Sequence, residues 1–284
     1  MATASIDGIA TRYEVIGSGQ PILMYAPGGF NAVVESWSTI GVYARTKMID
    51  HLPKRFTCIM FDRRECGQSG GRVEAVTWRS FVAQGKALLD HLGIARAHIM
   101  GGCMGCPPVA AFAVAHPETV LSMVLYWPVG GAKYRISSHQ RFAEHLGFVA
   151  SHGLDGVVAL VTKEGKSFGA DPRGGPWASV IKRDRAFAES YAAQQVEQYR
   201  TVCESMCRSL FDRDTAPGAE PEALMRVDIP ALIVPGHDAA HATSAARYLE
   251  ECLPQSDYWD VPVEQQTEDN VPARIVDFLG KVKS

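Results

Sequence analysis

The sequence predicts an α/β fold, with a mainly parallel sheet, helices on both faces of that sheet and an inserted helical cap. Three observations support this prediction. Up to about residue 130, apolar runs typical of buried strands alternate with helical patterns, which implies right-handed crossovers between parallel strands. Residues 131–225 contain no strand-like run of comparable strength, and strand character then returns at 229–235. We therefore divide the chain into core residues 1–130, a cap at 131–225 and core residues 226–284.

The bulk composition narrows the classes of function. The 284 residues are 46% hydrophobic and 21% charged, and the net charge is −3, which argues against a nucleic-acid partner. No apolar run approaches the roughly 20 residues of a membrane span, and the N-terminus lacks the features of a signal peptide. We expect a cytoplasmic protein that acts on a small molecule, with neither nucleic acid nor membrane as a partner. Composition does not decide the oligomeric state, and a homodimer is one option.

Cysteine usage points to reduced thiols. The chain has seven cysteines, an odd number without a regular framework, which suits the cytosol. Cys103 and Cys106 form a C-x-x-C pair, and such a pair can bind a metal or carry redox chemistry. However, no second Cys/His pair at ligand spacing accompanies it, and two prolines follow at once. We therefore expect no metal and no other cofactor.

The first strands and helix follow from the apolar pattern. Residues 9–16 alternate enough for a strand, and 21–26 and 56–61 are continuous apolar runs of the buried parallel kind. Residues 77–92 have the pattern of an amphipathic helix that ends at Gly93. This helix would lead into the next strand of the sheet.

The stretch around Cys103 predicts a strand, a sharp turn and a helix. An apolar run at 97–100 leads into Gly101-Gly102-Cys103-Met104-Gly105, and residues 109–115 have helical composition. The turn has the form G-x-nucleophile-x-G, in which glycines on both sides permit a strained backbone that holds one side chain above a parallel sheet. The pattern therefore predicts that Cys103 is a nucleophile.

The same turn would place groups that stabilise negative charge around Cys103. At a helix N-terminus, free N–H groups and the helix dipole favour the thiolate, and the Met104 N–H could donate to an oxyanion. We expect the second donor near Gly29 or Phe30, because this glycine directly follows the strand at 21–26 and its Pro-Gly turn. A plain tight turn is the alternative interpretation of that loop.

The later part of the chain indicates a helical cap followed by the rest of the core. Helices are expected at 140–151 and 185–211, with a glycine- and proline-containing loop at 166–177 between them. The remaining core elements are strands at 120–127, 229–235 and 258–261, a helix at 243–252 and a helix at 272–282.

The order of these features resembles the α/β-hydrolase fold. The shared features are a Gly-Gly loop after an early strand, Asp62-Arg63-Arg64 with Gly67 and Ser69, the G-x-C-x-G elbow, a helical insertion and a late strand that ends in Gly236-His237-Asp238. The elbow cysteine is similar to that of dienelactone hydrolases. The capped layout is similar to the esterase, epoxide-hydrolase and C–C-hydrolase branches.

The resemblance implies a place for each catalytic partner of Cys103. The family's acid lies just past the strand after the cap, where this chain has Asp238. The family's histidine lies in the loop after the last strand, which here is 261–270 and contains no histidine. His241 could replace it, because a carboxylate and an imidazole at i,i+3 can meet at the start of a helix. The other options are His237, Glu35, Glu65 or no base at all.

The cap is expected to form the roof of a pocket. Gly29, Trp127 and Tyr134 are predicted to contact the substrate, and other aromatic residues could line the same pocket or merely pack the cap onto the core. Those other residues are Tyr126, Trp177, Tyr191 and Tyr199. The cationic residues that could meet an anionic substrate, or form a solvated face, are Arg135, Lys163, Lys182 and Arg185.

A thiol nucleophile without the usual histidine favours activated substrates. A free thiol is already about a few per cent thiolate at neutral pH, whereas a serine hydroxyl is nearly inert without a base. We expect a cofactor-free hydrolase that forms an acyl-enzyme at Cys103 with a small activated ester, lactone or thioester. The same scaffold also hosts lyases, acyltransferases and dehalogenases. A chain that has lost its histidine could instead be a non-catalytic ligand-binding protein.

Overall fold

Eight strands form one sheet in the order β1-β2-β4-β3-β5-β6-β7-β8. The structure is a computed structural model and describes residues 2–282. Strands β3 to β8 pair in parallel, whereas β2 is antiparallel to both β1 and β4. The strands are β1 (Ala2–Ile6), β2 (Ile9–Gly17), β3 (Gln20–Tyr25), β4 (Phe56–Phe61), β5 (Ala97–Gly102), β6 (Val120–Tyr126), β7 (Ala231–Val234) and β8 (Ser256–Tyr258). The predicted mainly parallel sheet is thereby confirmed.

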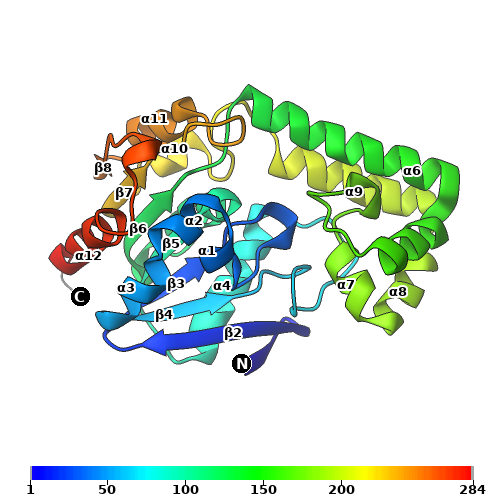
Figure 1. The fold of residues 1–284 in the computed structure, drawn as a ribbon, viewed down its shortest axis with the longest axis horizontal. Coiled ribbons are helices and arrows are strands. Elements are labelled where there is room, and N and C mark those ends of the chain that lie inside the picture. The colour runs from blue at the N-terminus through cyan, green and yellow to red at the C-terminus, as the bar shows by residue number, and fades with distance from the viewer. Residues whose placement is uncertain (1, 283–284) are drawn as a thin grey trace.

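Helices cover both faces of this sheet (Figure 1). The central strands β5 and β6 are buried along their whole length, as apolar strands between two helical layers must be. One layer consists of α1 (Ser36–Thr39), α2 (Gly41–Thr46), α3 (Met48–His51) and α12 (Val271–Lys281). The other contains α4 (Trp78–His91), α5 (Cys106–Ala115), α10 (Pro221–Leu224) and α11 (Thr243–Cys252). Thr77 caps α4, because its side chain accepts the Ser80 N–H.

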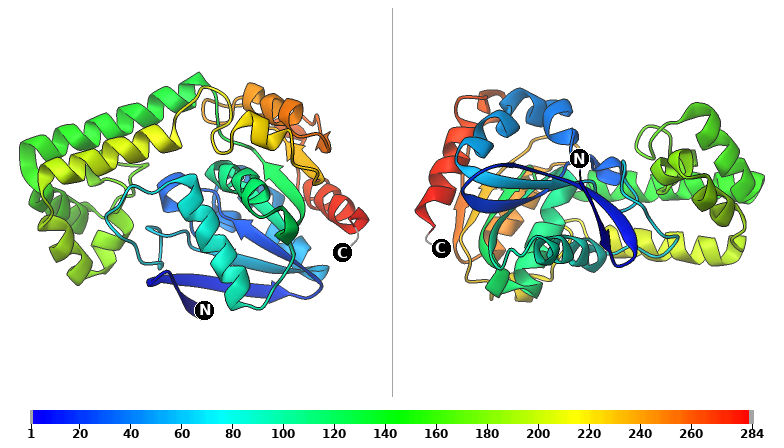
Figure 2. Two further views of the ribbon diagram at one scale, coloured as in Figure 1. Left: turned by 180° about the vertical axis from the view of Figure 1, so that it is seen from behind. Right: turned by 90° about the horizontal axis from the view of Figure 1, so that it is seen from below.

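A helical insertion lies between β6 and β7 and extends beyond the sheet (Figure 2). Its long helix α6 runs beside α9, and the shorter helices lie toward the far end of this pair (Figure 1). The helices of the insertion are α6 (Ala132–Glu164), α7 (Ala178–Arg183), α8 (Arg185–Ala192) and α9 (Val196–Leu210). By length and composition alone α6 could cross a membrane. However, Gly153 interrupts it, with φ of 67°, and its apolar residues Phe142, Val149 and Val157 are buried in the hydrophobic core.

Several elements differ from the prediction. The helix expected at 140–151 is part of the longer α6, Ala132–Glu164. Strand β1 was not predicted, although Asp7-Gly8 forms a two-residue hairpin with positive φ at both positions, a strong local signal for such a turn. The last strand is β8, Ser256–Tyr258, and not 258–261, because the Val261 N–H bonds back to the Trp259 carbonyl and turns the chain out of the sheet. The helix expected at 185–211 is divided into α8 and α9.

The loops that follow β3, β5, β6 and β7 all emerge at one edge of the sheet, where sites of this topology lie. The loops after β6 and β7 are joined there. The Gly130 N–H donates to the Ala240 carbonyl at 3.0 Å, and Gly130 forms a parallel bridge with His241. Sheet pairing thus continues past the ends of the strands and fixes where His241 lies.

Candidate active site

Cys103 occupies the sharp turn between β5 and α5. Its φ is +53°, an unfavourable value for a residue with a side chain. The flanking glycines are required for this turn, because a Cβ on Gly101 would lie 2.3 Å from the Gly105 carbonyl oxygen, and one on Gly105 would lie 2.2 Å from the Tyr25 carbonyl oxygen. The geometry agrees with the predicted elbow, and the strain is held by close packing of backbone on backbone.

The two cysteines of the C-x-x-C pair have different surroundings. The partly exposed Cys103 borders a cavity of about 250 Å³. Cys106 is buried, and its thiol donates to the carbonyl oxygens of Gly101 and Tyr126 at 3.2 and 3.4 Å. Among residues 2–282 no group of three or more Cys, His, Asp or Glu side chains could hold a metal ion. Cys106 therefore serves the core, whereas Cys103 faces the cavity.

Asp238 and His241 form a pair in the loop between β7 and α11. The Nδ1 atom of His241 lies 2.9 Å from both carboxylate oxygens of Asp238. The loop also holds this carboxylate in place, because the backbone N–H groups of Ala240 and His241 donate to its Oδ1 at 2.8 and 2.9 Å. The His241 side chain is only 12% exposed. Its orientation is therefore set by Asp238, as in a nucleophile, base and acid arrangement.

The other ring nitrogen of His241 faces the nucleophile. Nε2 is buried and has no partner in full hydrogen-bonding geometry among residues 2–282, and the effect of Cys103 and His241 on each other's pKa places the ring beside the sulfur. Burial raises the pKa of the Cys103 thiol, but His241 and the N–H groups of Gly28 and Met104 outweigh this and lower it below its usual value. Burial lowers the pKa of His241, whereas Cys103 and Asp238 together raise it to about 9. The two groups thus favour each other's charged forms, the Cys103 thiolate and the His241 imidazolium.

Trp127 and Gln266 support His241 from behind. The Trp127 ring lies 5.3 Å from the His241 ring, and its indole N–H donates to Gln266 Oε1 at 2.7 Å. The amide of Gln266 in turn donates to the carbonyl oxygens of Pro235 and Val261 at 2.9 and 3.3 Å. Trp127, which the sequence analysis predicted to contact the substrate, does not border the cavity, because its ring packs on the histidine.

The backbone around the sulfur supplies hydrogen-bond donors. The N–H groups of Met104 and Gly28 act on the Cys103 sulfur. Gly29 and Phe30 also border the cavity and begin a short 3₁₀ turn, η1 (Gly29–Asn31), whose first N–H groups have no partner within the turn. The Met104 N–H and the loop at Gly29 and Phe30, both predicted as sources of oxyanion donors, thus lie beside the sulfur and the cavity. Phe30 also contributes its ring to the cavity wall.

Buried arginine and aspartate side chains hold this loop. The Arg63 guanidinium donates to the Gly29 carbonyl, and the Asp62 carboxylate accepts the N–H groups of Val34 and Gln68 at 2.8 and 2.7 Å. Charge-assisted hydrogen bonds of this kind are strong. The loop is therefore attached to the segment after β4.

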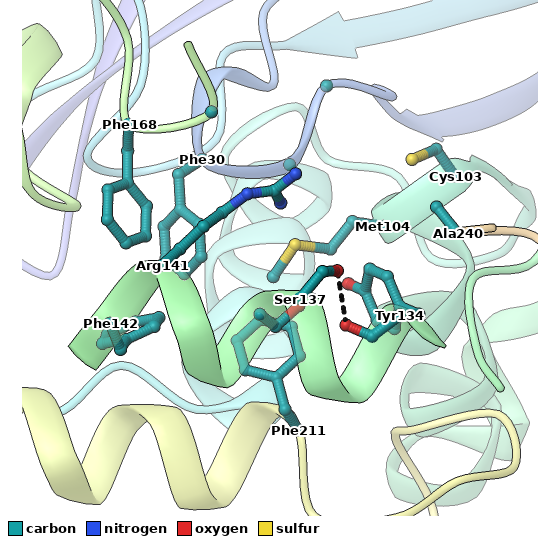
Figure 3. A pocket seen from close by; sticks show the side chains of 14 residues that line it. Phe30, Cys103, Met104, Tyr134, Ser137, Arg141, Phe142, Phe168, Phe211 and Ala240 are labelled. Atoms are coloured by element: carbon teal, nitrogen blue, oxygen red, sulfur yellow. Dashed lines mark hydrogen bonds between the residues drawn. The ribbon is translucent and has the colours of Figure 1, made fainter. Parts of the chain in front are cut away.

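The cavity wall is aromatic, with one cationic side chain (Figure 3). Phe30 packs against Phe142 and Phe168 with ring centroids 5.8 and 5.2 Å apart, and Phe211 and Tyr134 complete the wall. Of the predicted substrate contacts, Gly29 and Tyr134 border the cavity. The sequence did not single out the other polar residues of the wall, which are Ser137, Ser138 and Arg141.

The remaining candidates have other partners. Glu35 binds Arg12, and Glu65 binds Arg64. Burial raises the pKa of Glu65 to about 7. His237 is hydrogen-bonded to Thr243 at 3.1 Å. Four aromatic residues proposed for the pocket pack elsewhere, namely Tyr126, Trp177, Tyr191 and Tyr199, and the cations Arg135, Lys163, Lys182 and Arg185 also lie outside the wall.

Comparisons with known proteins agree with the fold. The family model for the alpha/beta hydrolase fold matches residues 21–150. A dihydrolipoyllysine-residue acetyltransferase component of the acetoin cleaving system, from Cupriavidus necator, is 31% identical over 127 residues, which are 45% of this chain and 32% of that protein. The chain thus spans about a third of the length of this curated relative.

Solved structures similar to this one include three hydrolytic enzymes by title. An alpha/beta hydrolase from a Medee basin deep-sea metagenome library has a TM-score of 0.66 and 19% identity, covering 100% of this chain and 98% of that one. The enol-lactonase from Burkholderia xenovorans LB400 has a TM-score of 0.63 and 18% identity over 99% and 100%. An esterase from Rhodococcus sp. ECU1013 has a TM-score of 0.61 and 19% identity over 99% and 98%. At these identities the likeness shows the fold.

Proposed function

We propose that this chain, which has the α/β-hydrolase fold, is a hydrolase that acts through an acyl-enzyme on Cys103. The observation that carries this proposal is the His241 ring, which Asp238 holds at Nδ1, which has a buried Nε2 without a partner among residues 2–282, and which interacts with the Cys103 sulfur. The mutual pKa shifts of Cys103 and His241 support a thiolate–imidazolium pair. Such a pair supplies a nucleophile and an acid in one place.

Acylation uses both members of the pair. The Cys103 thiolate attacks the carbonyl carbon of the substrate, and the resulting oxyanion accepts hydrogen bonds from the Met104 N–H and from N–H groups of the loop after β3. The carbon–heteroatom bond then breaks, and the imidazolium of His241 gives its Nε2 proton to the leaving group. The acylation half-reaction thus leaves a thioester on Cys103 and a neutral His241.

Deacylation restores the resting state. Neutral His241 takes a proton from water at Nε2 while the hydroxide oxygen attacks the thioester carbonyl. The tetrahedral intermediate expels the Cys103 thiolate and releases a carboxylic acid. The imidazolium and thiolate are regenerated, so the net reaction consumes one water molecule.

Substrates with good leaving groups are favoured by the nucleophile itself. A thiolate of lowered pKa is expelled from the tetrahedral intermediate more readily than an alkoxide is, because the less basic group leaves faster. We therefore propose small activated esters, lactones or thioesters as substrates. The cavity of about 250 Å³ has the volume of roughly eight water molecules, which suits a small acyl group. An enol-lactonase and an esterase among the similar structures are in keeping with this class.

Intact-protein mass spectrometry tests the acyl-enzyme. After mixing with 4-nitrophenyl butyrate, we expect one butyryl group per chain, absent in Cys103→Ala and retained in Cys252→Ala, whose thiol lies on α11. His241→Ala should be acylated and deacylated at least about 100-fold more slowly. Absence of Cys103-dependent acylation and of turnover would contradict the proposal and favour a ligand-binding protein.

Acyl transfer is the second candidate. The match to the acetyltransferase component favours it, since an acyl group on Cys103 could pass to a thiol acceptor instead of to water. Adding a dithiol such as dihydrolipoamide to the acylated protein distinguishes the two. Formation of the acyl dithiol in preference to the free acid would support the transferase.

A further inference from the structure

Helix α6 presents one polar face to the cavity beside Cys103. The residues of this face are Tyr134, Ser137, Ser138 and Arg141, at the spacing i, i+3, i+4 and i+7 that places side chains on a single side of a helix. Tyr134 and Arg141 are two turns apart, about 10 Å along the axis. The face therefore spans much of the length of a small ligand.

Arg141 is a cation without a counterion in the structure. No carboxylate among residues 2–282 forms an ion pair with it, and it is the one Asp, Glu, Lys or Arg side chain on the described cavity wall. Figure 3 shows its side chain extending from α6 toward the loop that carries Phe30. By contrast, Arg135 on the same helix is paired with Asp214 at 3.1 Å and lies outside the wall.

Tyr134 supplies a hydroxyl with no partner. The side chain borders the cavity and is only 8% exposed, yet its hydroxyl has no hydrogen-bond partner among residues 2–282. A buried hydroxyl left in this way costs free energy, so it is suited to donate to a bound ligand. Burial and the Cys103 charge raise the pKa of Tyr134, which keeps the proton on the hydroxyl.

Apolar rings fill the space between these two polar groups. Phe30, Phe142 and Phe168 pack edge to face on the wall, and the ring of Phe211 packs against this cluster at a tilt. The cavity therefore has a donor and a nucleophile, an apolar middle, and a guanidinium whose planar fork matches a carboxylate.

We propose that the substrate of this site carries a carboxylate, which Arg141 binds, with an apolar chain between that carboxylate and the reacting carbonyl beside Tyr134. This inference rests on the proposed function and names its substrate class. The carboxylate belongs either to the acyl part or to the leaving group, since both pass through the same cavity.

Two pairs of matched esters test the proposal. Mono-4-nitrophenyl adipate is compared with its methyl ester, which removes the charge from the acyl part. Likewise 4-acetoxybenzoate is compared with methyl 4-acetoxybenzoate, which removes it from the leaving group. We expect the charged member of one pair to have a kcat/KM about tenfold higher, as a charge-assisted hydrogen bond in a partly exposed site provides. The pair that shows the preference identifies the part that carries the carboxylate.

Variants assign the preference to α6. Arg141→Gln should remove it, Arg141→Lys should keep part of it, and Arg135→Gln should leave it intact. Tyr134→Phe should lower kcat for both members equally, because the hydroxyl acts at the reacting group. Equal rates for both members of both pairs, or a preference that survives Arg141→Gln, would overturn the proposal.

Binding separates this proposal from the proposed hydrolase activity. If no ester acylates Cys103, the hydrolase proposal fails. Titration calorimetry with adipate then still tests whether Arg141 binds a carboxylate. Saturable binding that weakens about tenfold in Arg141→Gln but not in Arg135→Gln supports it. The absence of both adipate binding and a charge preference rejects it, whether or not neutral esters are hydrolysed.

Discussion

Trp127 donates its indole N–H to Oε1 of Gln266 at 2.7 Å, although the two residues are 139 positions apart. Gln266 is fully buried and comes from the loop between β8 and α12. This loop thus holds the Trp127 ring on which His241 packs, whereas His241 comes from the loop between β7 and α11.

Replacing Gln266 by alanine should disturb catalysis more than folding. The change leaves the Trp127 indole and the carbonyls of Pro235 and Val261 without their partner, which costs about 1–3 kcal/mol of unfolding free energy. We expect kcat to fall about tenfold or more with the Cys103 acylation site retained, because His241 loses its support. Gln265→Ala, on the exposed neighbouring residue, should change neither urea unfolding nor kcat. Equal kcat values for the two variants would show that the support is dispensable.

The elbow and the acid–base pair could be predicted because their signals are local. Gly101, Cys103 and Gly105 lie within five residues, and Asp238 and His241 are three residues apart, so spacing alone brings them together. The loop at 261–270 contains no histidine, as the sequence shows, but it supplies Gln266, which holds the Trp127 ring against His241 and which the sequence did not single out.

Residues that depend on packing of distant segments could not be predicted in the same way. Trp127 is an aromatic residue of the kind that lines pockets, but its positive φ of 55° and its hydrogen bond to Gln266 turn the ring toward His241. Arg141 and Arg135 both belong to α6, and only the phase of the helix against the core decides which one faces the cavity. Strand β1 is different, because the adjacent Asp7-Gly8 pair is itself a local signal for the hairpin that joins β1 to β2.

Gly236 is predicted to be intolerant of a side chain for a reason specific to this histidine. An added Cβ would lie 2.6 Å from the His241 Cβ and 3.0 Å from the Trp127 ring. Gly236→Ala should therefore displace the imidazole and lower kcat about 100-fold. Gly147→Ala, where an added Cβ meets nothing within 4 Å in the middle of α6, should keep full activity and gain up to about 1 kcal/mol. Wild-type turnover in Gly236→Ala would mean that His241 does not act from this position.

Cys103 should be the thiol that iodoacetamide modifies first. Its pKa is lowered, whereas burial raises the pKa of Cys66 and Cys207 to about 11 and that of Cys58 and Cys203 to about 12. Since the thiolate is the reactive form, peptide mass spectrometry after brief labelling at pH 7 should find one modified site. His241→Ala should slow this labelling about tenfold by raising the Cys103 pKa. Faster labelling at Cys207 or Cys252 would contradict the assignment.

The pH dependence of acylation should have an alkaline limit set by His241. Acylation needs the Cys103 thiolate and the His241 imidazolium, so kcat/KM rises as pH passes the lowered Cys103 pKa and falls as pH passes the His241 pKa of about 9. Because Cys103 and His241 titrate as a coupled pair, the two limbs of the bell-shaped profile report pKa values of the pair.

Asp238 is one of the groups that raise the His241 pKa. Asp238→Asn should therefore move the alkaline limb to lower pH and reduce the maximum about tenfold or more. Asp260→Asn, which alters an exposed partner of Arg247, should leave the profile in place. An alkaline limb that stays near pH 9 in Asp238→Asn would show that another group sets it, and the pairing of Asp238 with His241 would then have no part in acylation.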